Sequence, residues 1–280
     1  MGHIMERMET REYKQVIKNM LEYIHKVCTE NNIRYFVAAG TLIGTIRHSG
    51  FIPWDDDIDI WMPYEDYMKF KRIVSVSDSL YYVLSPEDNR YYYHVFSRFC
   101  SKEGRLELNG IPDIDNLGPF IDIFVLHKAP YDKPERKRIF NAILKYDKKI
   151  KYCLPLKYYR TVSVKTRLWI LIHFPAYIIN RFFVGVSKLK AKRNEVVCSY
   201  DYTESSLYYS ASGSRCFDAI LFSEEDLNNP ICHKFEDMEV YIPRNYHELL
   251  TRRYGDYMKP LPIEERVTHH HFTAYRQIDQ

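Results

Sequence analysis

The spacing of apolar residues along this chain predicts a mixture of helices and strands. Between residues 9 and 31, apolar positions recur every three or four residues, as on one face of a helix. Residues 33–39 are apolar apart from Arg34, which indicates a buried strand. The same reasoning predicts helices at 9–31, 41–48, 64–74, 135–150 and 245–254, and strands at 33–39, 54–62, 81–84, 92–100, 119–126 and 235–243.

The strand predicted at 54–62 is unusually rich in carboxylates. Side chains alternate across a strand, so Asp57 and Asp59 are expected on one face while the isoleucines point into the core. Crowded carboxylates oppose one another's ionisation, so this face favours a bound cation. Hard oxygen ligands suit Mg²⁺ or Mn²⁺. An EF-hand calcium loop beginning at Asp55 is excluded, because its sixth position is Ile60 where glycine is needed.

Two other segments contain the remaining parts of a phosphate-handling site. Asp122 is a lone charge in the apolar run 119–126, so it is expected either to complete the metal site or to pair with Arg98. Gly40 and Thr41 open the predicted short helix, whose first backbone N–H groups favour a phosphate. The pattern predicts an enzyme that uses metal ions to act on a phosphate group.

Composition narrows the class of protein. The chain has 280 residues, of which 46% are hydrophobic, which indicates a globular protein with a substantial core. A net charge of +3 is too small to indicate a nucleic-acid partner. The first ten residues are polar and do not form a signal peptide, so we expect a cytoplasmic protein with free thiols. The six cysteines are widely scattered, and their spacing does not predict a zinc site: Cys28, Cys100, Cys153, Cys198, Cys216 and Cys232.

Residues 148–193 differ in character from the rest of the chain. They are rich in lysine and arginine and contain no acidic residue. Within them, 168–179 is strongly apolar but shorter than the roughly 20 residues of a membrane-spanning helix. Three interpretations stay open: buried helices with a solvated basic face, a helix lying on a membrane surface, or a groove for a phosphate-rich acceptor.

The segment from Gly40 to Asp59, GTLIGTIRHSGFIPWDDDID, resembles the signature of the LicD family of phosphotransferases. That family includes bacterial phosphocholine transferases and, more distantly, fukutin-type ribitol-phosphate transferases. Supporting similarities occur at 120–124, 235–236, 242–243, 254–257 and 261–262, and in the histidines after Arg266. The resemblance implies an α+β fold, with a nucleotidyltransferase-like mixed sheet flanked by helices and a helical basic insertion.

The resemblance also implies the reaction and its residues. A phospho-alcohol, phosphocholine above all, would move from a CDP-activated donor to a hydroxyl of a cell-surface glycan, such as a teichoic acid, or of its lipid-linked precursor. Mg²⁺ or Mn²⁺ would be held by the family's metal carboxylates, and the acceptor would bring the protein to the inner face of the cell membrane. The residues expected to act are the carboxylates Asp57, Asp59 and Asp122, the phosphate or nucleotide ligands Gly40, Thr41, Arg47, His48 and Arg98, and the more distant His270 and His271.

The segments take different expected tasks, and two residues depart from the family pattern. We expect a catalytic core at 1–147, an insertion at 148–230 that contacts the acceptor or a membrane, and a return to the core at 231–280. His127 stands where the family usually has aspartate, and Asp237 where glycine is common. The alternatives are a nucleotidyltransferase, a metal-dependent sugar transferase, and a glycan-binding protein without activity.

Overall fold

A computed structural model describes residues 4–77, 80–89, 92, 94–108, 117–151, 153, 164–179, 182, 185–212, 218–267 and 272–278. The helices are α1 (Thr10–Glu30), α2 (Ala39–His48), α3 (Tyr64–Val76), α4 (Lys133–Lys151), α5 (Val164–Ile178), α6 (Val186–Val197), α7 (Glu224–Asn228) and α8 (Tyr246–Tyr254), with a 3₁₀ turn at Ile263–Glu265. The strands are β1 (Ile4–Arg7), β2 (Phe36–Val37), β3 (Asp59–Pro63), β4 (Tyr81–Leu84), β5 (Ser97–Ser101), β6 (Arg105–Leu108), β7 (Phe120–Ala129), β8 (Leu207–Ser210), β9 (Leu221–Ser223), β10 (Ile231–Phe235), β11 (Met238–Ile242) and β12 (Phe272–Ile278).

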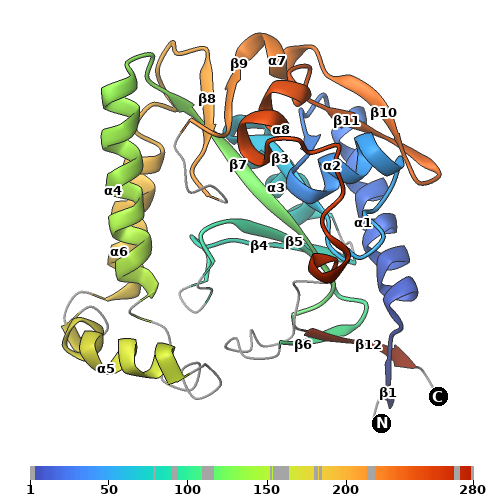
Figure 1. The fold of residues 1–280 in the computed structure, drawn as a ribbon, viewed down its shortest axis with the longest axis horizontal. Coiled ribbons are helices and arrows are strands. Elements are labelled where there is room, and N and C mark those ends of the chain that lie inside the picture. Colours follow the sequence, from blue (N-terminus) through green and yellow to red (C-terminus); the bar gives the residue numbers. More distant parts are fainter. Residues whose placement is uncertain are drawn as a thin grey trace.

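The largest sheet confirms the predicted α+β class. Its strands run in the order β2-β3-β7-β5-β4, and β8 and β9 extend it from the far end of β7. Only the β3–β7 pair among the described strands of this sheet is parallel, so the sheet is mixed. The long strand β7 crosses the middle of the molecule and pairs with three others (Figure 1). Residues on β7 therefore meet side chains from several parts of the sequence.

One face of the sheet is closed by helices α1 and α3. The ring of Phe99 on β5 lies 5.7 Å from that of Tyr23 on α1 and 5.5 Å from that of Phe70 on α3, measured between centroids. Tyr23 is half-buried, while Phe70 and Phe99 are fully buried. Burial of such rings contributes roughly 2–3 kcal/mol each, which anchors both helices to the sheet.

Helices α4 and α6 lie side by side and form a separate wing of the molecule (Figure 1). Their core includes Ile139, Ile143 and Val197, packed against Tyr209 of β8. Helix α5 lies beyond the ends of this pair, and the side chains described for it are exposed or half-buried. Within the part of the chain that the structure describes, no helix combines the length and apolar character that a bilayer crossing requires.

The last part of the chain returns to the first. Strand β12 pairs with β1 and β6, which brings the described ends of the chain together (Figure 1). The hairpin of β10 and β11 turns at Glu236, whose φ of 55° lies in the left-handed region. Glu236 reaches back to accept a hydrogen bond from the backbone N–H of Phe51 at 3.0 Å. A Cβ at Gly50 would lie only 2.1 Å from Glu236 Oε1, so a larger residue there would displace the Glu236 side chain from Phe51.

Several predicted boundaries were wrong, and the acidic strand is the most consequential. Strand β3 begins at Asp59, so the residues from 54 to 58 form a turn and an extended loop instead of strand. Consecutive carboxylates disfavour strand pairing, because side chains on both faces would carry charge into the sheet. The segment predicted as one strand at 235–243 contains the last residue of β10, the turn and β11, and the strands predicted at 33–39 and 92–100 shorten to β2 and β5.

Candidate active site

A row of charged side chains crosses the centre of the main sheet. Asp59 on β3 is opposite Asp122 on β7, and Asp122 is opposite Arg98 on β5. Paired residues on adjacent strands share a face, so all three side chains emerge on the same side. Their exposed fractions are only 8%, 9% and 6%. A buried row of two acids and one base in an otherwise apolar sheet indicates a functional site.

Arg98 and Asp122 form the ion pair that the sequence left as an alternative. Arg98 Nε donates to Asp122 Oδ1 at 2.8 Å, and the guanidinium carbon lies 3.7 Å from the centroid of the Phe120 ring. The ion pair and a metal site are compatible, because a carboxylate has two oxygens and about four lone-pair positions. Arg98 therefore orients Asp122.

Electrostatic repulsion marks Asp59 as the centre of the acidic group. Burial raises the pKa of Asp59 well above its usual range, and the charges of Asp57, Asp122 and Asp55 raise it further. The charge of Arg253 opposes this rise. Three other carboxylates thus act on Asp59, although Asp57 and Asp55 lie in the loop before β3 and not on the strand. The loop, and not strand alternation, brings Asp57 to Asp59.

Thr41 holds Asp59 in place. The Thr41 hydroxyl accepts a hydrogen bond from the backbone N–H of Asp59 at 2.9 Å, and Thr41 itself is 4% exposed. Ala38 N–H also donates to the Asp59 carbonyl at 2.8 Å. We had expected the Thr41 hydroxyl to bind phosphate directly. Its observed contact is with the backbone of the acidic strand, so it positions a carboxylate.

Gly40 lies in the first turn of α2, beside the acidic loop. Helix α2 begins at Ala39, two residues earlier than predicted, and its first helical hydrogen bond runs from Leu42 N–H to the Ala38 carbonyl. The earlier N–H groups point out of the helix end without helical partners. A Cβ at Gly40 would lie 2.7 Å from Asp55 Oδ2, so the close approach of this carboxylate requires glycine.

Ala39 shows that the turn before Gly40 is strained. Its φ of 44° lies in the left-handed region, which costs about 1–2 kcal/mol for a residue with a Cβ. Backbone strain of this kind concentrates at ligand-binding sites, where the surrounding fold maintains it. The turn from strand β2 to helix α2 thus has the backbone geometry expected of a binding turn.

Two polar atoms close to Asp122 are buried and have no partner. Within the described residues, Arg98 Nη1 and the hydroxyl of Tyr92 make no hydrogen bond. Tyr92 is completely buried, and this burial raises the pKa of its hydroxyl. The charge of Arg98 acts in the opposite direction, and the charge of Asp122 adds to the rise. Leaving buried donors unsatisfied costs about 1–3 kcal/mol each, so these atoms fit a bound ligand. Tyr92 carries no motif and was not predicted from the sequence.

Arg47 and His48, which were predicted as phosphate or nucleotide ligands, contact each other and the segment after α8. Arg47 Nη1 donates to the backbone carbonyl of Tyr257 at 3.0 Å, and Arg47 Nε donates to His48 Nε2 at 2.9 Å. Arg47 thereby ties the end of α2 to the segment after α8. His48 is largely exposed. Partial burial of its ring, and then the charge of Arg47, lower its pKa.

Helix α8 contributes residues that the sequence analysis missed. Arg253 acts on the pKa of Asp59, and the charges of Asp59 and Asp57 act on Tyr254, whose pKa burial raises. The Arg253 guanidinium carbon lies 5.1 Å from the centroid of the Tyr254 ring. These residues follow the acidic loop by almost 200 positions, and only the contact of α8 with α2 brings them near it. His270 and His271 lie outside the described residues.

The carboxylates fit a hard divalent cation. All four candidate ligands, Asp55, Asp57, Asp59 and Asp122, offer oxygen, and the opposing charges nearby include Arg98, Arg253 and, beside Asp55, Lys14. A cation would relieve the mutual repulsion that raises the Asp59 pKa. The donor set is therefore that of a Mg²⁺ or Mn²⁺ site and not of a zinc site built from nitrogen and sulfur.

Comparison with known proteins points to one family. Residues 32–161 match the family described as LicD/FKTN/FKRP, nucleotidyltransferase domain. The chain is 28% identical over 279 residues to the lipopolysaccharide cholinephosphotransferase LicD of Haemophilus influenzae, an alignment that covers 97% of this chain and 99% of that protein. The human ribitol 5-phosphate transferase FKRP is 33% identical over 52 residues, which cover 19% of this chain and 10% of that protein.

A further relative is an uncharacterized protein of Rickettsia prowazekii, 29% identical over 152 residues that cover 52% of this chain and 47% of that protein. The matched family domain contains Gly40, the acidic loop, Arg98 and Asp122. It does not contain α6 or α8, which begin at residues 186 and 246. The row of charges on the sheet thus lies within the part of the molecule that the family model matches.

Proposed function

We propose that this chain is a transferase of the LicD type, because residues 32–161 match that family model and nearly the whole chain aligns with a cholinephosphotransferase. It would move a phospho-alcohol, phosphocholine first among them, from a CDP-activated donor to a hydroxyl group of a cell-surface glycan or its lipid-linked precursor. The single observation that supports this most strongly is the buried row Asp59, Asp122 and Arg98. It combines carboxylates for a cation with a guanidinium donor for phosphate on one face of a sheet.

The bonds exchanged in this reaction are defined by its donor. The acceptor hydroxyl oxygen forms a bond to the phosphorus that carries the alcohol. The bond from that phosphorus to the bridging oxygen of the diphosphate breaks, and CMP leaves with the electron pair. The hydroxyl proton passes to a base or to water. The products are CMP and a phosphodiester on the glycan.

Each residue of the row has a proposed task. Asp57, Asp59 and Asp122 would hold Mg²⁺ or Mn²⁺, which when bound would offset the negative charge of the diphosphate and its leaving group. Arg98 Nη1, which is buried without a partner, would donate to a phosphate oxygen. Asp122 already binds Arg98 through Oδ1, so we assign its remaining oxygen to the cation and not to proton abstraction. Thr41 keeps Asp59 aligned.

We propose that helix α5 rests on a membrane surface and brings the acceptor to the site. Its exposed apolar side chains include Leu171 at 71%, Ile172 at 68% and Leu168 at 61%, spaced as on one helical face. Exposed lysines occur nearby in sequence at the end of α4 and on α6. Apolar side chains beside cations are typical of helices that lie on an anionic bilayer. Acceptor choice would then belong to the 148–230 segment.

A donor screen tests the function. The purified chain is incubated with Mn²⁺ or Mg²⁺, a glycan acceptor, and in turn CDP-choline, CDP-ribitol, CTP or a nucleotide sugar. Release of CMP from a CDP-alcohol is the expected result. Pyrophosphate from CTP would instead establish a nucleotidyltransferase, and use of the nucleotide sugar alone a sugar transferase. No product from any donor, with either metal, would contradict enzymatic activity.

A further inference from the structure

A second group of metal-binding side chains lies on the other face of β7. His127 and Asp122 are five residues apart on this strand, so their side chains point to opposite faces about 16 Å apart along it. His127 meets Cys198, the residue that ends α6, and Asp201 in the turn that follows. The cluster is thus separate from the acidic site.

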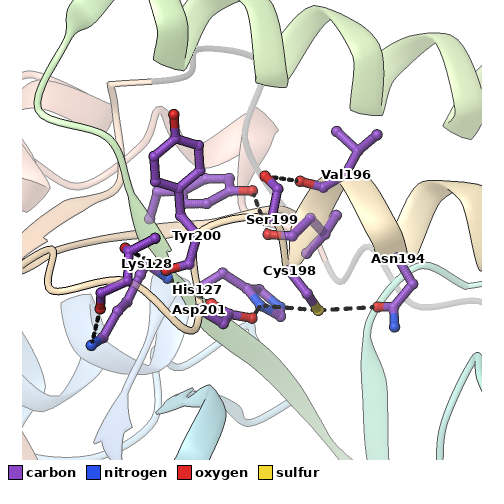
Figure 2. Close-up of polar contacts among 11 residues, drawn as sticks. His127, Lys128, Asn194, Val196, Cys198, Ser199, Tyr200 and Asp201 are labelled. Carbon is purple, nitrogen blue, oxygen red and sulfur yellow. Dashed lines mark hydrogen bonds and ion pairs between the residues drawn. The ribbon is translucent and has the colours of Figure 1, made fainter.

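The three side chains converge on one point (Figure 2). His127 Nδ1 lies 2.7 Å from Asp201 Oδ2 and 3.8 Å from Cys198 Sγ. One ligand atom from each residue lies within 4.8 Å of those from the other two. The side chains of His127 and Asp201 are 8% and 1% exposed, and Cys198 is half-buried. Nitrogen, sulfur and oxygen donors therefore face one another in a protected place.

This arrangement is not that of a cysteine nucleophile activated by histidine. In such a triad the carboxylate binds one ring nitrogen and the thiol binds the other. Here the carboxylate and the thiol both approach Nδ1 of His127. Two groups that compete for one nitrogen are better explained by a shared central atom.

We propose that His127, Cys198 and Asp201 bind a zinc ion. Ideal tetrahedral zinc with ordinary bond lengths separates its nitrogen and sulfur ligands by about 3.6 Å and its nitrogen and oxygen ligands by about 3.3 Å. The first separation is close to that observed, and the second requires Asp201 to retreat by roughly 0.6 Å. Binding replaces the thiol proton of Cys198 by the metal and releases that proton to solvent.

The surroundings of the cluster supply the supports that such a site needs. The backbone N–H of Lys128 donates to Asp201 Oδ1 at 2.8 Å, which leaves Oδ2 directed at His127. Asn194 Oδ1 lies 3.6 Å from Cys198 Sγ and points at the cluster in Figure 2. Hydrogen bonds to the far oxygen of a ligating carboxylate are typical outer contacts of metal sites.

The fourth ligand position is accessible. A cavity of about 250 Å³ is lined by His127 and Asn194 together with Tyr64 and Arg193. Water, the Asn194 amide oxygen or a small anion held near Arg193 can therefore complete the coordination. Bound zinc would fasten the end of α6 to β7, and so hold the wing of α4 and α6 against the sheet.

The test is a metal measurement that reports sulfur coordination. The full chain is loaded with Zn²⁺ or Co²⁺ and dialysed, and its metal content is determined. We expect one tightly held equivalent and a thiolate-to-cobalt charge-transfer band. This band distinguishes the cluster from the oxygen ligands of the acidic site and from His269, His270 and His271, which contain no sulfur.

Variants identify the cysteine. Cys198→Ser and His127→Gln should each abolish the band and reduce zinc affinity at least about 100-fold. Cys232→Ser, which alters an exposed cysteine on β10, should leave both unchanged. If Cys198→Ser does not fold, X-ray absorption spectroscopy at the zinc edge of the wild type tests the proposal. The spectrum must show one sulfur atom about 2.3 Å from the zinc. Absence of sulfur in that spectrum, or a cobalt band that persists in Cys198→Ser, would overturn the proposal.

Discussion

The hydroxyl of Thr41 accepts a hydrogen bond from the backbone N–H of Asp59, and this bond joins the start of α2 to the start of β3. The contact joins the first and last residue pairs of the segment 40–59, which resembles the LicD signature. It explains why a hydroxyl residue follows Gly40, since Asp59 enters the sheet next to the turn that Gly40 forms. The acidic site therefore depends on a residue that need not touch any substrate.

Replacing Thr41 with valine should separate this positioning role from packing. Valine keeps the shape but leaves the buried N–H of Asp59 without an acceptor, which costs about 1–3 kcal/mol of unfolding free energy. We expect lower stability in chemical denaturation and a reduced kcat, whereas Thr41→Ser should restore both. Equal activity in Thr41→Val and wild type would show that the hydrogen bond does not align Asp59.

Asp59→Asn should lower the activity of the protein and raise the stability of its metal-free form. Loss of one metal carboxylate removes several kcal/mol of charge stabilisation, which corresponds to roughly 1000-fold in the rate of CMP release. Without metal, the same change removes a repelled carboxylate from a buried position and should raise the melting temperature. Glu30→Gln, at the exposed end of α1, is the control and should change neither quantity. A melting temperature that still rises on addition of Mn²⁺ to Asp59→Asn would count against the metal assignment.

Arg98→Lys tests the guanidinium that lacks a partner. Lysine keeps the charge but cannot bind Asp122 and a phosphate at once in the planar geometry of arginine. We expect KM for the CDP donor to rise about 10–100-fold. Arg34→Lys is the matched control, because Arg34 pairs with the buried Asp66 at 2.6 Å elsewhere in the fold. If both variants change KM equally, the effect of Arg98 is structural.

His94 should make the protein sensitive to mild acid. Burial, and then the charge of Arg98, lower the pKa of His94 to about 3. The unfolded chain has the ordinary value near 6.5, so below that pH it binds the proton that the folded chain refuses. Stability therefore falls as pH decreases from about 6.5 towards 3, with a slope that approaches 1.4 kcal/mol per pH unit.

The measurement is chemical denaturation at several pH values. His94→Phe should flatten the loss of stability between about pH 6.5 and 4, because phenylalanine carries no proton and can occupy the ring row between Tyr92 and Phe96. A variant whose stability falls as steeply as that of the wild type would show that other groups dominate the acid response.

The exposed face of α5 can be tested with vesicles. Replacing Leu171 and Ile172 together with serine should reduce flotation with anionic vesicles at least about tenfold, since each buried apolar side chain contributes more than 1 kcal/mol. The control is Val76→Ser, which changes a side chain that is 79% exposed at the end of α3. No flotation of the wild-type chain at low salt would refute membrane contact by α5.

The sequence predicted the chemistry of the site better than its geometry. Asp122 and Arg98 could be selected because each is a charge in an apolar segment, and Asp59 because it belongs to a cluster of carboxylates. Asp57 was predicted for the wrong reason, as alternation along a strand that begins only at Asp59. Repulsion among consecutive carboxylates opposes strand pairing, and rules based on the spacing of apolar residues do not account for it.

Contacts between segments that are far apart in the sequence could not be predicted. The cluster of His127 and Asp201 joins residues 74 positions apart, and cysteine spacing could not suggest it because Cys198 is its only sulfur. Tyr92 lies in a segment without a recognisable motif, and Arg253 lies just before the similarity at 254–257. The proximity of both to the carboxylates follows from packing. Such relationships depend on the tertiary fold, which local patterns do not encode.

The hairpin turn at Glu236 has a consequence for how the protein is made. The loop that leads to the acidic residues is held by Glu236 through Phe51, by Tyr257 through Arg47, and by Arg266 over Trp54. All three braces belong to the last fifty residues of the chain, whereas the loop is synthesised within the first sixty. On the ribosome, all the proposed metal carboxylates are thus synthesised before these three bracing residues. The acidic site can therefore be fully braced only after residues up to Arg266 have been synthesised.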